Sequence, residues 1–265
     1  MNGKAKKILR LDVLLVEKGL APNLDKARAY IGAGKVRIDG LLADKSGHLV
    51  PLDSTIEISN PPQPYVSRGG VKLAHALEHF SINVSGLIGM DVGASTGGFT
   101  DCLLKNGAVR IYAVDVGYGQ LDWTLRNDNR VVVMERTNIR YLAPQAIGEQ
   151  IDIVTADTSF ISLKKVIPAT MRIIHPGSMI IALIKPQFEV DRTKIEKGGI
   201  IKNSLLHQEV LDDLTVFFKN NLNLEIMGLI RSPILGVKGN TEFLIYMRLK
   251  HQTSENTLKF QYKMV

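Results

Sequence analysis

The sequence predicts an α/β fold in which a mostly parallel, seven-stranded sheet carries helices on both faces, preceded by a small α+β domain. Apolar strand-like runs alternate with helical patterns over residues 65–250, and such alternation is typical of a parallel sheet covered on both sides. Three prolines within residues 60–64 indicate a stiff linker. We therefore predict domains over residues 1–59 and 65–250, joined by the linker 60–64 and followed by a loose polar tail over 251–265.

The strands of the larger domain are predicted from apolar runs of four to seven residues. These runs cover residues 87–92, 111–114, 131–134, 151–156, 178–184, 224–229 and 243–249. Helical periodicity marks residues 163–174 and 205–220, whereas the last two runs follow each other without a long helix between them.

The first domain is expected to hold two short helices and a few short strands. One helix starts at Leu11 and ends at Gly19; Asn23 can cap a second, which stops at Gly32-Ala33-Gly34. Residues 35–39 alternate between polar and apolar, as in a half-buried strand, and short strands follow near 41–43 and 55–58. The candidate RNA-binding residues, which could form one basic face, are Arg10, Arg28, Lys35 and Arg37.

Composition narrows the class of protein. The net charge of +7 favours a polyanionic partner, and the first ten residues hold four cations and no acid, although such an arm can also be a solubilising tail. The single cysteine, Cys102, excludes an internal disulfide and a zinc site built on cysteines. We expect no metal site and a cytoplasmic location, because no run reads as a signal peptide or approaches the roughly 20 apolar residues of a membrane span.

Lys185 is the most informative position. It follows the apolar run 179–184 and precedes Pro186, which ends the strand because proline has no N–H to donate. Ligands bind open α/β sheets at the carboxyl ends of the strands, and a partly desolvated lysine can act as a base. A lysine at a strand end can equally extend into solvent, so position alone leaves both interpretations open.

A glycine-rich turn after the first large-domain strand predicts a cofactor site, because glycines let the backbone approach a ligand. Its candidate cofactor-binding residues are Asp91, Gly93, Ala94, Ser95, Gly97, Gly98 and Phe99. Asp115 and Asp157 lie at the ends of the second and fourth strands, and Asn138 comes after the third; we expect Asp115 to hold a ribose and Asn138 to bond an adenine edge. Asn138 can also be an ordinary turn residue, and Asp157 can be a helix cap.

The residues of this turn distinguish between two classes of cofactor, a dinucleotide and S-adenosylmethionine. A dinucleotide site requires Gly-x-Gly-x-x-Gly, but Ser95 occupies the second glycine position. A carboxylate at Asp91, expected within the turn, would repel a pyrophosphate but suits a sulfonium and an amino group. The pattern resembles motif I of S-adenosylmethionine (SAM) methyltransferases; NAD and a turn without ligand remain the alternatives.

Longer motifs resemble known families. Residues 8–59, with Lys-Ala-Arg-Ala-Tyr-Ile from Lys26 and Gly-Lys-Val-Arg-Ile-Asp-Gly from Gly34, resemble the S4 RNA-binding domain. Ser-Arg-Gly-Gly-Val-Lys-Leu from Ser67 and Lys-Pro-Gln-Phe-Glu from Lys185 resemble FtsJ-like RNA 2′-O-methyltransferases, which have a Rossmann-like fold. Together they resemble the hemolysin A (TlyA) family. That resemblance implies a catalytic tetrad, which consists of Lys72, Asp157, Lys185 and Glu242.

The resemblance implies SAM-dependent methylation of a ribose 2′-hydroxyl in ribosomal RNA, at a cytidine, with Lys185 as the general base. Ribosomal RNA or ribosomal subunits are the expected partners, without stable membrane insertion. Two alternatives stay open: a non-catalytic RNA-binding or ribosome-assembly factor, and a membrane-active haemolysin. The intact tetrad argues against the first, and the lack of a membrane-span signal argues against the second.

Overall fold

The computed structural model describes residues 7–32, 34–43, 45–59, 64–195, 199–236 and 238–250. The chain divides into two compact units, residues 1–64 and 65–265, each described by itself below. Several predicted features lie outside the described residues: most of the basic arm, the linker apart from Pro64, and the polar tail 251–265.

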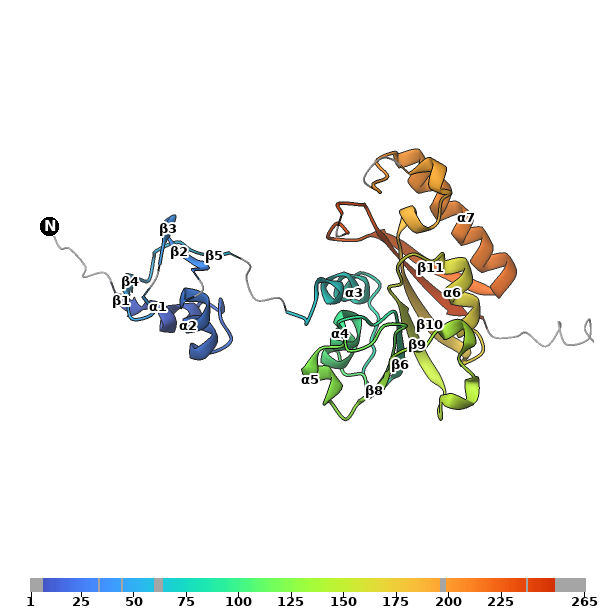
Figure 1. Cartoon of the computed structure of the whole chain (residues 1–265), viewed down its shortest axis with the longest axis horizontal. Helices are drawn as coiled ribbons and strands as arrows, with labels where there is room; N and C mark the ends of the chain where they lie inside the picture. The colour runs from blue at the N-terminus through green and yellow to red at the C-terminus, as the bar shows by residue number, and fades with distance from the viewer. Residues whose placement is uncertain are drawn as a thin grey trace, which may run out of the picture. The chain divides into compact units, whose positions relative to one another are not determined.

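Within its described residues, the first unit contains two helices and two small antiparallel sheets (Figure 1). The helices are α1 (Leu11–Glu17) and α2 (Leu24–Gly32); one sheet pairs β1 (Ile8–Arg10) with β4 (Leu49–Pro51), and the other has the order β3 (Leu41–Leu42), β2 (Val36–Ile38), β5 (Ile56–Ile58). Asn23 caps α2 as predicted, because its Oδ1 accepts a hydrogen bond from Lys26 N at 2.9 Å. The pairing of β1 with β4 was not predicted, since three-residue strands carry too short a pattern.

The second unit is built on the predicted seven-stranded sheet. The strands are β6 (Ile88–Val92), β7 (Arg110–Val114), β8 (Val131–Met134), β9 (Ile151–Ala156), β10 (Ile174–Ile184), β11 (Leu224–Arg231) and β12 (Phe243–Leu249). Their order is β11-β12-β10-β9-β6-β7-β8. The pairs from β10 to β8 are parallel, whereas β12 is antiparallel to both β10 and β11.

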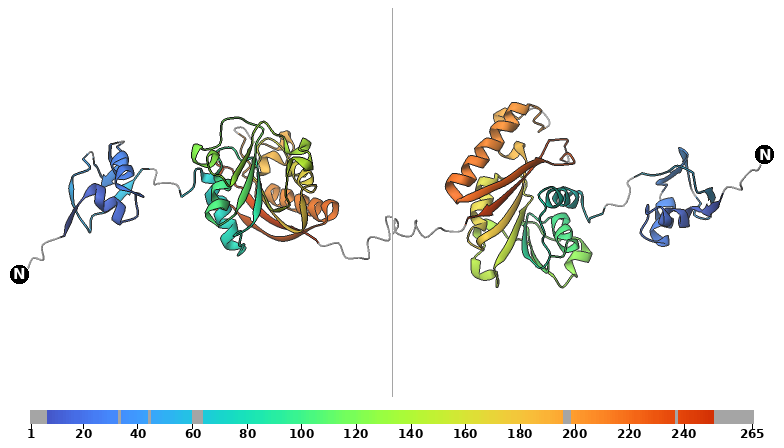
Figure 2. Two further views of the ribbon diagram at one scale, coloured as in Figure 1. Left: turned by 90° about the horizontal axis from the view of Figure 1, so that it is seen from below. Right: turned by 180° about the vertical axis from the view of Figure 1, so that it is seen from behind.

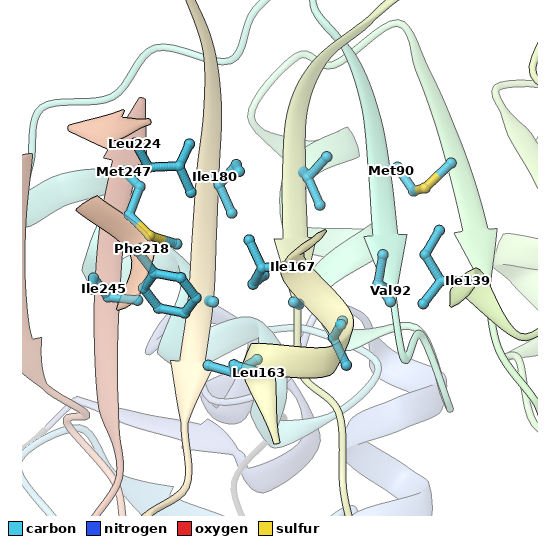
Figure 3. Close-up of a cluster of buried hydrophobic side chains, with 14 of the residues drawn as sticks. Met90, Val92, Ile139, Leu163, Ile167, Ile180, Phe218, Leu224, Ile245 and Met247 are labelled. Atoms are coloured by element: carbon cyan, nitrogen blue, oxygen red, sulfur yellow. The ribbon is translucent and has the colours of Figure 1, made fainter. Parts of the chain in front are cut away.

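Helices cover both faces of this sheet (Figures 1 and 2). They are α3 (Arg68–His79), α4 (Gly98–Lys105) and α5 (Trp123–Arg126) on one face, with α6 (Leu163–Thr170) and α7 (Ser204–Leu222) on the other. Figure 3 shows the core beneath α6 and α7, where Phe218 and Leu163 pack against residues of β10 and β12 such as Ile180 and Ile245. The two-sided cover confirms the predicted fold class.

Two predicted boundaries are wrong around α6. The helix was expected to continue to residue 174, but it ends at Thr170, and β10 begins at Ile174 instead of residue 178. The apolar residues that extend the helical pattern also fit a strand, and β10 pairs with β9 through a register shift between Ile174 and Met179. Short apolar runs do not distinguish the two structures.

Among the described residues, no helix is both long enough and apolar enough to cross a membrane.

Replacing Leu214 tests the contribution of α7 to this core. Leu214 is fully buried, so Leu214→Ala should lower the free energy of unfolding by about 2–5 kcal/mol through lost burial and a residual cavity. Val216 lies on the same helix but is 56% exposed, so Val216→Ala should change it by less than about 0.5 kcal/mol. Urea denaturation of the full chain measures both values; equal effects would contradict the packing of α7 described here.

Candidate active site

The strand register brings three predicted residues to one edge of the sheet. Asp157 follows β9 and Lys185 follows β10, and these parallel strands pair through Ala156 and Ala182. Glu242 precedes the antiparallel strand β12, whose first residue, Phe243, is opposite Ile184 at the end of β10. The carboxyl ends of β9 and β10 and the start of β12 therefore meet.

Lys185 forms an ion pair with Asp157 at this edge. The Nζ of Lys185 lies 2.6 Å from Oδ1 of Asp157 and donates a hydrogen bond to Oγ of Ser159 at 3.0 Å. Oδ1 of Asp157 is buried and accepts no hydrogen bond of standard geometry from the described residues. Its contact with Lys185 is therefore an ion pair and not a hydrogen bond. The side chain of Lys185 is only 11% exposed, so it does not extend freely into solvent.

Lys72 and Glu242 form a second ion pair, with Nζ and Oε2 separated by 2.5 Å. Both side chains are at least nine-tenths buried, and burial of unpaired charges at such a position would be costly. Lys72 reaches the site from α3, which is anchored on the sheet by buried residues including Leu73 and Leu77. The room for Glu242 depends on Gly236, where a Cβ would lie 2.4 Å from the Glu242 carboxylate.

The glycine-rich turn connects β6 to α4 and passes close to Asp157. Gly93 has a φ of +84°, and a Cβ there would lie 2.7 Å from the backbone oxygen of Asp157. Gly97 has a φ of +93°, and its Cβ would lie 2.3 Å from Leu125. Only glycine fits both the backbone conformation and the space at these two positions. The turn thus forms a cradle of backbone that packs closely against neighbouring segments beside the ion pairs.

Asp91 is placed differently from the prediction. It is the last but one residue of β6 and not part of the turn, and it is 1% exposed. One oxygen accepts hydrogen bonds from N and Oγ1 of Thr100, and the other accepts one from Oγ1 of Thr155. Burial raises the pKa of Asp91 to about 7 despite these bonds. The carboxylate therefore ties α4 to the central strands.

Asp115 and Asn138 line one cavity beside the glycine-rich turn, and each accepts hydrogen bonds from nearby backbone N–H groups. Asp115, after β7, accepts hydrogen bonds from the N–H groups of Ser95 and Gly117 at 2.8 and 2.7 Å. Asn138, after β8, accepts one from the N–H of Arg140 at 3.1 Å and so caps a short 3₁₀ helix. Further lone pairs of Asp115 and the amide nitrogen of Asn138 have no hydrogen bond within the described part of the chain.

Three cavities adjoin the site. The tetrad cavity, of about 290 Å³, is lined by all four tetrad residues together with the glycine-rich turn. The turn cavity, of about 440 Å³, is lined by Asp115, Asn138 and apolar residues such as Val114 and Ile139. The aromatic cavity, of about 420 Å³, is lined by Phe160, Phe188, Gln187, Lys238 and Asn240. Lys185 and Glu242 line both the tetrad and aromatic cavities, and Ser159 lines all three.

The predicted basic residues of the first unit are only partly brought together. Arg10 and Arg28 both bind Asp12, at 2.9 and 3.1 Å, and both arginines stay half exposed. Hydrogen bonds from Arg10 and Arg28 hold the pKa of the buried Asp12 well below its usual range. Lys35 and Arg37 make no contact with this pair in the described residues; Arg37 donates a hydrogen bond to Gly40 O instead.

Sequence reasoning missed several residues that the structure brings to the site. Ser159, Phe160 and Phe188 line cavities there, and Glu189 joins two of its loops. The motifs around Asp157 and Lys185 contain all four, but nothing in a single sequence shows which side chains of a motif face each other.

Comparison with known proteins identifies the family. A family model described as FtsJ-like methyltransferase matches residues 65–249. The protein "16S/23S rRNA (cytidine-2′-O)-methyltransferase TlyA" of Mycobacterium tuberculosis is 45% identical over 241 residues, which cover 90% of this chain and 89% of that protein. The chain belongs to the FtsJ-like methyltransferases of the hemolysin A (TlyA) type. The predicted family is thereby confirmed.

Other TlyA-type relatives and the first unit agree with this assignment. An S4 domain model matches residues 9–56. The rRNA methyltransferase candidate YqxC of Bacillus subtilis is 46% identical over 239 residues, which cover 90% of this chain and 85% of that protein. A solved structure of a hemolysin candidate from Streptococcus thermophilus aligns with a TM-score of 0.71 and 39% identity, covering 94% of this chain and 90% of that chain.

The pKa of Asp91 predicts a pH-dependent stability. An acid whose pKa is higher in the folded state than its usual value near 4 binds more protons when folded, so stability falls as pH rises from about 4 to about 7. We expect the free energy of unfolding of the unsubstituted protein to decrease between pH 5 and pH 8 relative to that of Asp91→Asn, which lacks this titration. Urea denaturation at both pH values measures the difference, and parallel profiles would contradict it.

Proposed function

We propose that this TlyA-type protein is a SAM-dependent RNA methyltransferase that methylates the 2′-hydroxyl of a cytidine ribose in ribosomal RNA. The observation that carries the proposal is the opening of two lysine–carboxylate pairs onto one cavity beside a glycine-rich turn. The relatives support the substrate, because the matching protein of Mycobacterium tuberculosis is named for cytidine-2′-O methylation of 16S and 23S rRNA.

The turn cavity and the glycine-rich turn fit SAM. A nucleoside requires an apolar slot with polar groups at its edges; Val114 and Ile139 supply the slot, while Asp115 and Asn138 supply the edges. A Cβ at Gly93 or Gly97 would collide with Asp157 or Leu125, so glycine at these positions allows the turn to keep the shape of the cradle. Thr158 also lines this cavity, and its buried hydroxyl has no hydrogen-bond partner among the described residues.

We assign the other predicted cofactor residues to the cradle. These are Asp91, Gly93, Ala94, Ser95, Gly97, Gly98 and Phe99, which line the tetrad cavity or shape the turn. Because the oxygens of Asp91 already bind Thr100 and Thr155, we propose that Asp91 supports the cradle by joining α4 to the central strands. When bound, SAM supplies a methyl group activated by a positively charged sulfur.

Lys185 is the proposed general base. A ribose hydroxyl is a weak nucleophile until its proton is removed, and a positioned base in its neutral form can take that proton as the oxygen attacks. Lys185 lines both the tetrad cavity and the aromatic cavity, so it can contact a methyl donor in one cavity and an acceptor ribose in the other. Asp157 and Ser159 hold the Nζ in this position.

The second pair completes the site. Lys72 adds a positive charge to the tetrad cavity, and Glu242 both balances that charge and fixes its direction. The aromatic cavity offers two phenyl rings, of Phe160 and Phe188, whose centroids are 5.0 Å apart. RNA-binding sites commonly use such rings to stack unpaired bases. We therefore propose that the acceptor nucleotide enters through the aromatic cavity.

The first unit is the proposed anchor for folded RNA. Arg10 and Arg28 present two exposed guanidinium groups that Asp12 holds at fixed positions, and such groups contact phosphates well. Lys35 and Arg37 add positive charge on and beside β2. Phosphate contacts supply affinity and orientation, while selection of the target nucleotide requires contacts to the base.

The test of the proposed function is transfer of labelled methyl groups from SAM to ribosomal subunits, followed by mapping of 2′-O-methylated positions. Methylation at cytidines that are unmodified without the protein would support the proposal. RNA binding without transfer would instead favour a non-catalytic assembly factor, and lysis of red cells by a transfer-deficient variant would favour a membrane-active haemolysin.

Lys185→Ala tests the general base. We expect the rate of methyl transfer to fall by about 10²–10⁴-fold, because the hydroxyl proton has no positioned acceptor. Binding of SAM, measured by calorimetry, should remain. Lys219→Ala removes an exposed lysine in the last turn of α7 and serves as the control with unchanged rate. Near-normal transfer by Lys185→Ala would refute the assignment.

Arg10→Ala and Arg28→Ala test the RNA contact of the first unit. Each should weaken binding of rRNA fragments and reduce the slope of log K against log salt by about 1, if each arginine neutralises one phosphate. Titrations at several salt concentrations measure the slope, with Lys219→Ala again as the control. An unchanged slope in both variants would place the RNA contact elsewhere.

A further inference from the structure

The segments that follow β9 and β10 are joined to each other by side-chain contacts at both of their ends. At the near end, Lys185 binds Asp157 and Ser159, as described above. At the far end, Glu189 binds the residues that start α6: its Oε2 accepts a hydrogen bond from Oγ of Ser162 at 2.6 Å, and its Oε1 accepts one from N of Leu163 at 2.9 Å. These two sets of contacts lie at either end of the loop 157–162.

The contact of Glu189 with Ser162 and Leu163 caps the start of α6 from another segment of the chain. Ser162 is the N-cap of α6 and its Oγ already accepts a hydrogen bond from Lys164 N, so the N–H of Leu163 needs a different acceptor. Glu189 provides it from 26 residues away in sequence. A carboxylate also suits the positive end of the helix. Burial raises the pKa of Glu189 above its usual value.

The enclosed loop holds an unfavourable backbone conformation. Phe160 has a φ of +63°, which non-glycine residues rarely adopt, and its side chain is 89% exposed, so burial of the ring does not compensate. Its ring contacts Phe188, on the segment between Lys185 and Glu189. A strained loop keeps its shape only when the surrounding structure fixes it. Here the contacts on either side of Phe160 supply that constraint.

We propose that Glu189 is a positioning residue of the methyl-transfer reaction. By holding the start of α6, it fixes the far end of the loop and thereby keeps Asp157 and Ser159 in contact with Lys185. Glu189 itself lines none of the three cavities, so it touches no reacting atom. This inference rests on the proposed function, since it concerns the geometry of the proposed base.

Glu189→Ala and Glu189→Gln test this role in the full chain, with transfer to ribosomal subunits measured at saturating SAM and RNA. Small displacements of catalytic groups are costly, so we expect Glu189→Ala to lower kcat by about 10–100-fold. Gln keeps an acceptor for Leu163 N and can donate to Ser162 Oγ, so Glu189→Gln should stay within about threefold of the unsubstituted protein.

Asp213→Asn is the matched control. Asp213, on α7, binds Lys164 in the first turn of α6 at 2.6 Å, but it contacts neither Ser162 nor Leu163 in the described residues. Its substitution should leave kcat unchanged. If Glu189→Ala fails to fold, Ser162→Ala removes the other side of the same hydrogen bond and should lower kcat in the same direction.

A double-mutant cycle separates positioning from general stabilisation. If Glu189 acts through Asp157, then adding Glu189→Ala to Asp157→Asn should lower kcat by less than about twofold further. A merely structural role predicts that the two losses multiply, which would overturn the proposal, as would an unchanged kcat in Glu189→Ala. Lack of transfer by the unsubstituted protein would instead refute the proposed function, so the two failures are distinguishable.

Discussion

The pairing of β10 with β9 on one side and with β12 on the other determines where the chemical groups of the second unit can lie. Parallel pairing places Asp157 and Lys185 at the same edge of the sheet, and antiparallel pairing of β12 turns Glu242 back to that edge. Because these strands are central and buried on both faces, the positions of the groups that end them are fixed by the core.

Charge compensation is the second constraint on this edge. The side chains of two lysines and two carboxylates are largely buried, and each cation contacts one anion. Such pairs are a poor source of stability, because removing charges from water costs about as much as their attraction returns. Their retention in a site that opens onto three cavities is better explained by chemistry. A buried carboxylate also pairs with cations in the first unit, where Asp12 holds two exposed arginines in place.

Much of the site could be predicted because its residues stand in sequence motifs at predictable strand ends. Lys185 and Asp157 end strands whose apolar runs were long enough to recognise, and Lys72 and Glu242 followed from the resemblance to a family. The structure corrects the placement of Asp91, which was expected in the turn. Its position depends on which residue of β6 is the last to pair, and hydropathy does not reveal this.

The sequence by itself determined the fold class, the family and the residue types at the strand ends, because local patterns and motifs encode them. Only the tertiary structure decided which lysine pairs with which carboxylate, that Arg10 and Arg28 share Asp12 while Lys35 and Arg37 do not join them, and that Glu189 caps α6. Three of these contacts, Arg28–Asp12, Leu163–Glu189 and Lys72–Glu242, join residues that are 16, 26 and 170 positions apart. Contacts over such separations depend on register and packing, which no local pattern records.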